Sequence, residues 1–343
     1  MAQRNSTPDI AVIAIADLID GYVSNSLGNS EFQTDIKNLL QKLDPNKDLS
    51  KQMLKGIKSR LDRRAREENQ NGKRMRSISW GAIRSLNDNQ IGEIIKPKPI
   101  RFLEDDVGQQ KEPNYPSDTN FTIKYQGLYC KDRTGDRGWF GPSDEPYVIT
   151  STVHVNNGDN VVRTERHPVG YPDKRYGDVD SGEYRNGPVS ACWFGKENEV
   201  SLISTVMEND EGDPDAYKEQ INALVEIGAL VAKSYGVNVP DYIKGLVVDA
   251  INWVIDSDDD VIGVESITLS PYFLKIYASQ NDRNFHNNGR TVPITHDHSM
   301  YHDEDGKYYS FFTVEADKPP SNSGDWRDLR IRLENYDDSR IQI

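Results

Sequence analysis

Val200-Ser-Leu-Ile-Ser-Thr-Val-Met207 is an apolar run that leads directly into the acidic turn Glu208-Asn-Asp-Glu211. A second acidic turn, Asp258-Asp-Asp-Val-Ile-Gly263, leads into another strand-like stretch that ends at Leu269. Carboxylates spaced two apart on a loop after a strand can wrap a hard cation such as calcium, and a glycine permits a tight bend where the next strand begins. The pattern predicts two strands joined through acidic segments, which either bind a cation or are solvated turns.

Charge divides the chain into two unequal parts. The formal net charge is −14, but residues 1–100 hold 17 basic against 12 acidic side chains, and the remaining residues hold 24 against 43. Such an asymmetry indicates two parts with different partners, and the 343 residues are enough for two domains. Because a surplus of carboxylates repels polyanions, we expect no nucleic-acid partner.

Cysteine content and hydropathy bear on the compartment. The only cysteines are Cys130 and Cys192, which we expect to be buried free thiols rather than a disulfide framework. Asp9, Asp17 and Asp20 interrupt the first apolar run, and no apolar stretch is long enough to span a bilayer. The sequence therefore predicts a soluble chain that is made in a cytoplasm and either stays there or is exported without a signal peptide.

The first 95 residues have the helical period. Apolar residues recur three and four apart from Ile10 to Tyr22, Ser30 is placed to cap a second helix, and a third helix carries Met53 and Ile57. We predict a small helical bundle over residues 1–95. A Pro-rich polar linker follows over residues 96–120.

The third helix runs into a basic segment that is a candidate partner-binding surface. Residues 51–76 contain ten basic and three acidic side chains. The segment either contacts an acidic partner, which could be anionic lipid, nucleic acid or the acidic part of this chain, or is a solvated helix face. The partner-binding candidates are Arg60, Arg63, Arg64, Arg66, Lys73 and Arg74.

From Phe121 onward the apolar period changes to two. Alternating runs begin at Phe121, Tyr147 and Val200, and an aromatic run begins at Tyr308. Such runs, separated by Gly, Asp, Asn and Pro, predict an antiparallel β-sandwich over residues 121–343. A helical hairpin at about residues 213–255 interrupts it and either binds a partner or, as we favour, packs onto the sandwich. The fold class is thus α+β, with a helical bundle followed by a sandwich that carries an inserted αα-hairpin.

A second stretch has the same character as the first. Leu128-Tyr-Cys-Lys-Asp-Arg-Thr-Gly135 leads through a loop to Ser143-Asp-Glu-Pro-Tyr-Val148. Together with Glu208-x-Asp210 and the segment Asp259-Asp-x-Ile-Gly263, this order resembles the C-two domain, the calcium- and lipid-binding β-sandwich of the synaptotagmin type. The resemblance covers about residues 121–270, and the run at 308–315 suits the last strand of that family.

The resemblance implies a calcium site at one end of the sandwich. Glu145 is inserted into the family's Ser-Asp-Pro-Tyr pattern, so either Asp144 or Glu145 could be a ligand, and Asp136 competes with Asp132. Crowded carboxylates repel one another until a cation neutralises them, which couples binding to the order of the loops. The implied ligands are Asp132, Asp144, Glu145, Glu208, Asp210, Asp259 and Asp260.

A histidine-rich stretch offers a different chemistry. His296 and His298 are two apart, so they point the same way if the stretch is a strand, and His302 follows. The three histidines are either a second metal site of the zinc or iron type or part of a polar loop. No motif places a nucleophile beside a base, so enzymatic activity has little support.

The function we expect is binding. Calcium-ordered loops would dock the chain onto a protein complex or an anionic membrane, and the chain would be a component or cargo of a larger assembly. The alternative is a metal-dependent hydrolase that uses the three histidines.

Overall fold

The computed structural model describes residues 7–58, 112–134, 143–156, 158–209, 213–234, 251, 260–281, 294–298 and 306–321. Residues 48–58 form a helix that carries no label. The labelled helices and strands, in chain order, are α1 (Thr7–Val23), α2 (Glu31–Leu43), β1 (Phe121–Asp132), β2 (Pro146–Asn156), β3 (Asp159–His167), β4 (Tyr184–Gly195), β5 (Val200–Glu208), α6 (Pro214–Ser234), β6 (Asp260–Leu269), α8 (Pro271–Asn281), β7 (Ile294–His298) and β8 (Lys307–Ala316).

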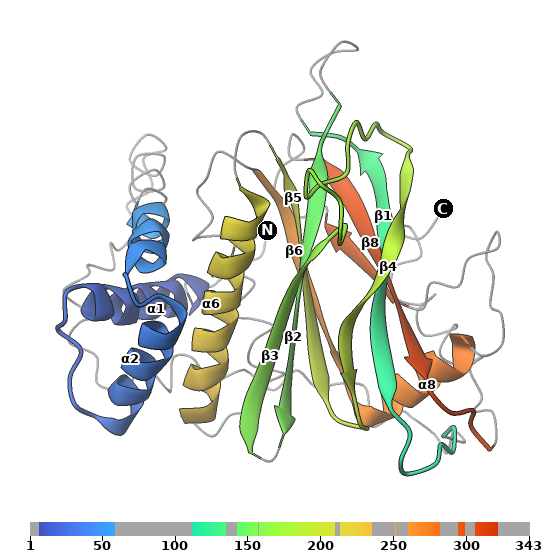
Figure 1. Cartoon of the computed structure of the whole chain (residues 1–343), viewed down its shortest axis with the longest axis horizontal. Coiled ribbons are helices and arrows are strands. Elements are labelled where there is room, and N and C mark those ends of the chain that lie inside the picture. The colour runs from blue at the N-terminus through green and yellow to red at the C-terminus, as the bar shows by residue number, and fades with distance from the viewer. Residues whose placement is uncertain are drawn as a thin grey trace.

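Two antiparallel sheets of four strands form the centre of the molecule (Figure 1). Their strand orders are β4-β1-β8-β7 and β3-β2-β5-β6. The sheets pack face to face, because one buried apolar cluster takes side chains from both of them. That cluster includes Phe121, Ile123, Tyr125, Val148, Leu202, Val206, Ile262, Phe312 and Val314.

The β3-β2-β5-β6 sheet is covered on its outer face as well. Every residue of β5 is buried, with Leu202 and Val206 in the inter-sheet cluster and Ile203 and Met207 in a second cluster. The second cluster contains the apolar side of α6, which lies on β3 and β2. A strand buried on both faces has few exposed positions, and from Val200 to Met207 it carries apolar side chains or the small buried hydroxyls of Ser201, Ser204 and Thr205.

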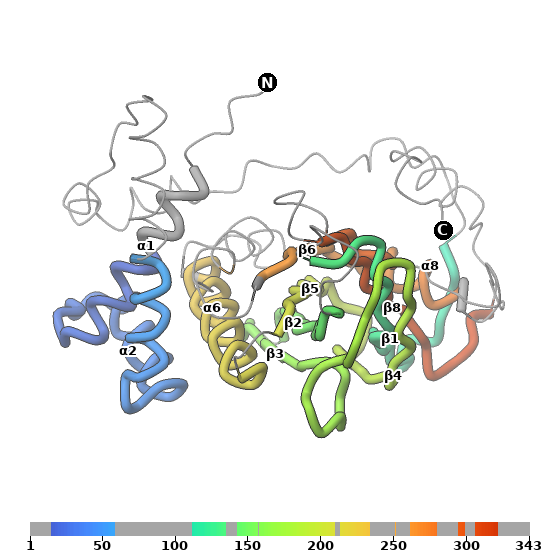
Figure 2. The backbone as a smooth tube through the Cα atoms, turned by 90° about the horizontal axis from the view of Figure 1, so that it is seen from above, coloured from blue at the N-terminus to red at the C-terminus, as the bar shows by residue number. Residues whose placement is uncertain are grey.

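The N-terminal helices add a further layer beside α6 (Figures 1 and 2). Their ends are fixed by polar side chains: Ser30 accepts a hydrogen bond from the Gln33 amide at 3.2 Å. Asp44 accepts bonds from the amides of Asp48 and Ser50 at 3.0 and 2.7 Å, which caps the helical residues 48–58.

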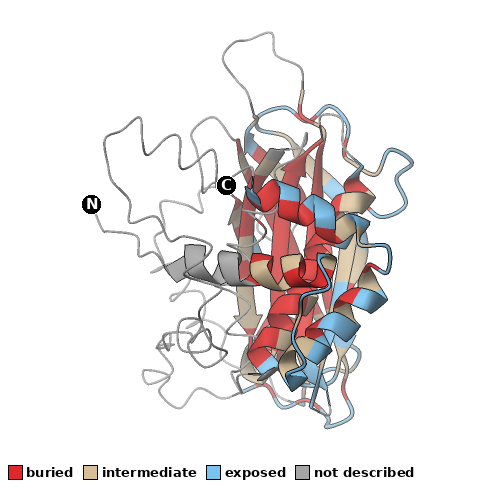
Figure 3. Cartoon of the chain, turned by 90° about the vertical axis from the view of Figure 1, so that its left-hand side faces the viewer, coloured by how far each residue is buried: buried red, intermediate tan, exposed pale blue. Residues whose placement is uncertain are grey.

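The buried sides of these helices belong to the same cluster as α6. Ile19, Ile36 and Ile57 are all in that cluster, and α2 lies against α6. In Figure 3, where the helices face the viewer, exposed residues gather on their outward surfaces and the strands behind are mostly buried. The helical and sandwich parts therefore share a hydrophobic core.

The structure confirms the α+β class and the antiparallel sheets, and it places Cys130 and Cys192 as buried free thiols. Of the predicted insertion, α6 packs onto the sheet, and Ile251 is helical and buried. Most of residues 235–259 lie outside the described residues, as do 59–95, so the hairpin and the bundle remain predictions. The sequence reasoning did not foresee α8 or the edge strand β3.

Because α2 shares its core with α6, we predict that Ile36→Ala lowers the free energy of unfolding by about 2–5 kcal/mol. The matched control is Lys37→Ala on the exposed side of α2, which should change it by no more than about 0.5 kcal/mol. Urea unfolding followed by circular dichroism measures both. Equal midpoints for the two variants would contradict the shared core.

Candidate functional site

Strand pairing brings Glu208 of β5 and Asp260 of β6 together at one end of the β3-β2-β5-β6 sheet. Glu208, the last residue of β5, lies opposite Pro146 of β2 on one side and opposite Asp260 of β6 on the other. The Asn209 amide donates to the carbonyl oxygen of Glu145 at 3.3 Å. The start of β2, the end of β5 and the first residue of β6 therefore lie side by side at one end of this sheet.

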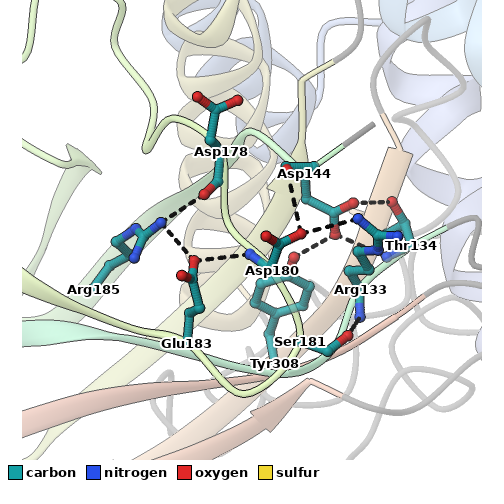
Figure 4. A network of polar contacts seen from close by, with 10 residues as sticks. Arg133, Thr134, Asp144, Asp178, Asp180, Ser181, Glu183, Arg185 and Tyr308 are labelled. Carbon is teal, nitrogen blue, oxygen red and sulfur yellow. Dashed lines mark hydrogen bonds and ion pairs between the residues drawn. The ribbon is translucent and has the colours of Figure 1, made fainter. Parts of the chain in front are cut away.

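Asp144 ties the end of β1 to the same place (Figure 4). Its side chain is 3% exposed, and the backbone amide and hydroxyl of Thr134 donate to its carboxylate at 2.8 and 2.9 Å. The hydroxyl of Tyr308 from β8 donates to the same carboxylate. Burial, together with the negative charge of Asp144, raises the pKa of Tyr308, so this hydroxyl remains a donor. Asp144 thus acts as an internal anchor between β1, β2 and β8.

A second set of contacts holds the loop between β3 and β4 to this anchor (Figure 4). Arg133 forms an ion pair with Asp180 at 3.0 Å, and Ser143 donates to the same carboxylate at 3.2 Å. Glu183 accepts from the Asp180 amide at 3.0 Å and from Arg185 at 2.6 Å. Arg133 and Ser143, the neighbours of Thr134 and Asp144 in the sequence, are therefore both held by Asp180 of this loop.

Glu145 forms an ion pair with an arginine of the same chain. Arg175 forms an ion pair with its carboxylate at 3.0 Å and donates to the Asn209 side-chain oxygen at 2.5 Å. The guanidinium thus bridges the segment before β2 and the segment after β5.

Two further basic residues hold the start of α6. Lys174 forms ion pairs with Asp213 and Asp215 at 2.9 and 2.8 Å, and Arg166 forms one with Asp215 at 3.0 Å. The hydrogen bond from Lys174 lowers the pKa of Asp215. Opposite charges of this chain thus neutralise part of the acidic end.

The other implied ligands are only partly described. Asp132 is exposed at the end of β1, opposite Lys307 of β8, whereas Glu208 is 9% exposed. Asp210, Asp259 and the competing Asp136 lie outside the described residues, and Asp260 is described in its backbone alone.

Within the described part of the chain, no group of three or more His, Cys, Asp or Glu side chains is arranged to hold a metal ion. The calcium site therefore remains a prediction that depends on Asp210 and Asp259.

His296 and His298 of β7 are buried between the sheets, and the described part of the stretch, residues 294–298, is a strand. Ser204 Oγ lies 2.6 Å from His296 Nδ1, and Ser310 Oγ lies 2.8 Å from His298 Nε2. His298 Nδ1 donates to the Gly263 carbonyl oxygen at 3.2 Å, and burial lowers the pKa of His298 to about 3. Both ring nitrogens of His298 are engaged, which favours a structural role. His302 lies outside the described residues.

Gly263 is needed for close packing and not for the backbone bend that the sequence predicted. It lies inside β6, next to a register shift, rather than at the start of the strand. A Cβ atom there would lie 3.0 Å from the Cα atom of His298. The close approach of β7 to β6 therefore requires glycine.

The predicted basic surface cannot be placed, because Arg60, Arg63, Arg64, Arg66, Lys73 and Arg74 all lie outside the described residues. The sequence reasoning missed Thr134, Tyr308 and Arg175 as partners of the acidic segments. Of the three, only Arg175 could have been suspected from the sequence, because Lys174-Arg175 is a basic pair in an otherwise acidic region. Thr134 and Tyr308 reach Asp144 through sheet packing that no local pattern reveals.

No protein-family model matches this chain, and no characterised protein shows significant sequence similarity to it. Among the helices that the structure describes, none is long and apolar enough to cross a membrane.

We predict that Asp144→Asn lowers the free energy of unfolding by about 1–3 kcal/mol. The single oxygen of the asparagine side chain cannot accept all the hydrogen bonds from Thr134 and Tyr308, and its NH₂ group would face these donors. Tyr308→Phe should also lower the free energy of unfolding. The decrease in the double variant should be smaller than the sum of the two single decreases, because Tyr308 and Asp144 share a hydrogen bond.

The control for the Asp144 measurement is Asp159→Asn at the β2–β3 turn, where the carboxylate is 80% exposed and paired with Lys233. Its effect on unfolding in urea should be within about 0.5 kcal/mol. An Asp144→Asn variant as stable as this control would show that Asp144 is not an anchor.

Proposed function

We propose that this chain is a calcium-regulated binding module whose acidic loop end docks onto a protein partner in a larger assembly. The observation that carries the proposal is the register in which Glu208 lies opposite both Pro146 and Asp260. This register sets Glu208 beside Asp260, which is far from it in the sequence, and neighbouring carboxylates attract a hard cation with oxygen ligands.

The calcium ligands in this proposal are Glu208, Asp210, Asp259 and Asp260, with Asp132 from the first loop. Asp144 is assigned to the structural anchor, because Thr134 and Tyr308 already donate to its carboxylate. Glu145 would have to give up Arg175 before it could bind a cation.

A protein partner is favoured over a membrane by two features. Residues 101–343 hold 24 basic against 43 acidic side chains, so anionic lipid would be repelled without bound cations. The apolar side of α6, the described part of the predicted insertion, packs onto the sheet and is not available to enter a bilayer.

The hydrolase alternative has no specific observation in its favour. His296 and His298 are buried between the sheets, and both contact hydroxyl groups there. A metal site at these histidines would need zinc or iron in the purified protein that is lost on His298→Ala.

The test is thermal and urea unfolding of the full chain in EDTA and in millimolar calcium. If calcium is present at a hundredfold excess over its dissociation constant, it should stabilise the native state by about 2.7 kcal/mol. Asp210→Asn and Asp260→Asn should each remove most of this stabilisation, since each loses a charged ligand.

One control replaces calcium with magnesium. The other is the variant Asp159→Asn at the start of β3, which pairs with the end of β2 that lies away from Pro146. Asp159→Asn should keep the full calcium response. A wild-type chain that unfolds identically in EDTA and calcium would refute the calcium mechanism, and an equal loss in Asp159→Asn would show that the response is a general charge effect.

A further inference from the structure

The β3–β4 edge of the sandwich is closed by a buried histidine. His167 is the last residue of β3, and it is 0% exposed. One ring nitrogen lies 2.9 Å from the hydroxyl of Thr150 on β2, and the other lies 2.8 Å from the hydroxyl of Ser190 on β4. β2 and β4 belong to different sheets, so this side chain bridges the two layers.

The surroundings of His167 suit a neutral ring. Tyr125 of β1 stacks on it, with ring centroids 4.3 Å apart, and the Sγ atom of Cys192 lies 3.8 Å from its Nε2 atom. A neutral imidazole donates through one nitrogen and accepts through the other, and both hydroxyls can complement it.

Among the residues that the structure describes, the titratable groups of the other elements around His167 supply no counter-ion. From β1 and β4 these are Tyr125 and Cys192, and burial raises the pKa of both. Tyr176 of the following loop donates to Tyr125. β2 contributes Thr150, which does not titrate, and His154 further along, which contacts Trp193.

The charges on β3 itself oppose protonation. Burial, followed by the positive charges of Arg166 and Arg163, lowers the pKa of His167 to about 3. Glu165 is the acidic residue of this segment, and its carboxylate pairs with Arg163. A proton on His167 would therefore be a buried positive charge beside other positive charges.

The direction of the pH effect follows from linkage. An exposed histidine has a pKa of about 6.5, so an open form takes up a proton below that pH, whereas the closed form stays neutral down to about pH 3. Opening is therefore favoured progressively as the pH falls from 6.5 toward 3, and closure is fully favoured above 6.5.

We propose that His167 is an acid-sensitive latch that holds β3 and β4 together while its ring is neutral and releases this edge of the sandwich when it is protonated. The segment after His167 carries Lys174 and Arg175, which hold Asp215 and Glu145. Release of the latch thus loosens the acidic loop end, whether or not that end binds calcium.

The experiment is hydrogen–deuterium exchange of the full chain at pH 7 and pH 5, corrected for the intrinsic pH dependence of exchange. Peptides from β4 should show an opening constant about 25-fold larger at pH 5, as expected for one group that titrates near 6.5 in the open form. Peptides from α2 are the internal reference, because the first 153 residues contain no histidine.

Variants separate the latch from general acid effects. His167→Gln, which is neutral at both pH values, should lose the 25-fold factor in β4. His298→Gln, at the buried histidine of the opposite edge, should keep it. The latch is refuted if β4 and α2 respond equally in the wild type, or if the factor persists in His167→Gln. If His167→Gln does not fold, the wild-type comparison of β4 with α2 decides.

Discussion

The structure depends on the burial of one sheet from both sides. β5 is buried along its whole length: one face packs against the β4-β1-β8-β7 sheet, and the other needs a separate cover. α6 provides that cover, and its own outer side is in turn covered by α1, α2 and the helical residues 48–58. The order of layers in Figure 2 follows from this single requirement. The N-terminal helices are therefore part of the same hydrophobic core as the sandwich.

The acidic loop end of the sandwich is held by hydrogen-bond donors and basic side chains of the same chain. Thr134 and Tyr308 satisfy Asp144, Arg175 pairs with Glu145, and Lys174 pairs with Asp215. An acidic end that is partly neutralised from within has less self-repulsion and a fixed geometry. It also presents a divalent cation with fewer unoccupied carboxylates than the sequence motif implies. Ion pairs with half-exposed partners are individually weak, so they can be exchanged for a stronger ligand.

The inter-sheet core is unusual in the polar groups it contains. His167 bridges the layers at one edge, and His298 contacts groups of both sheets at the other. Each is satisfied by hydroxyl or carbonyl groups rather than by carboxylates, and burial lowers the pKa of both rings. On the latch proposal, the packing at the His167 edge depends on pH in a range where most of the carboxylates remain ionised.

The sequence by itself determined the class of structure and the ends of several elements. Alternation with period two marked β1, β2 and β5 as strands, and Ser30 marked the start of α2, because these signals depend on local geometry. The prediction that the acidic segments meet at one end came from the family resemblance, and the described residues bear on it only through Glu208 and Asp260. Only the tertiary structure decided which carboxylates are already satisfied, since Thr134, Tyr308 and Arg175 reach them from other elements. It also decided that α6 packs on the sheet and that His167 and His298 are buried, because burial is set by which surfaces meet and not by the residues alone.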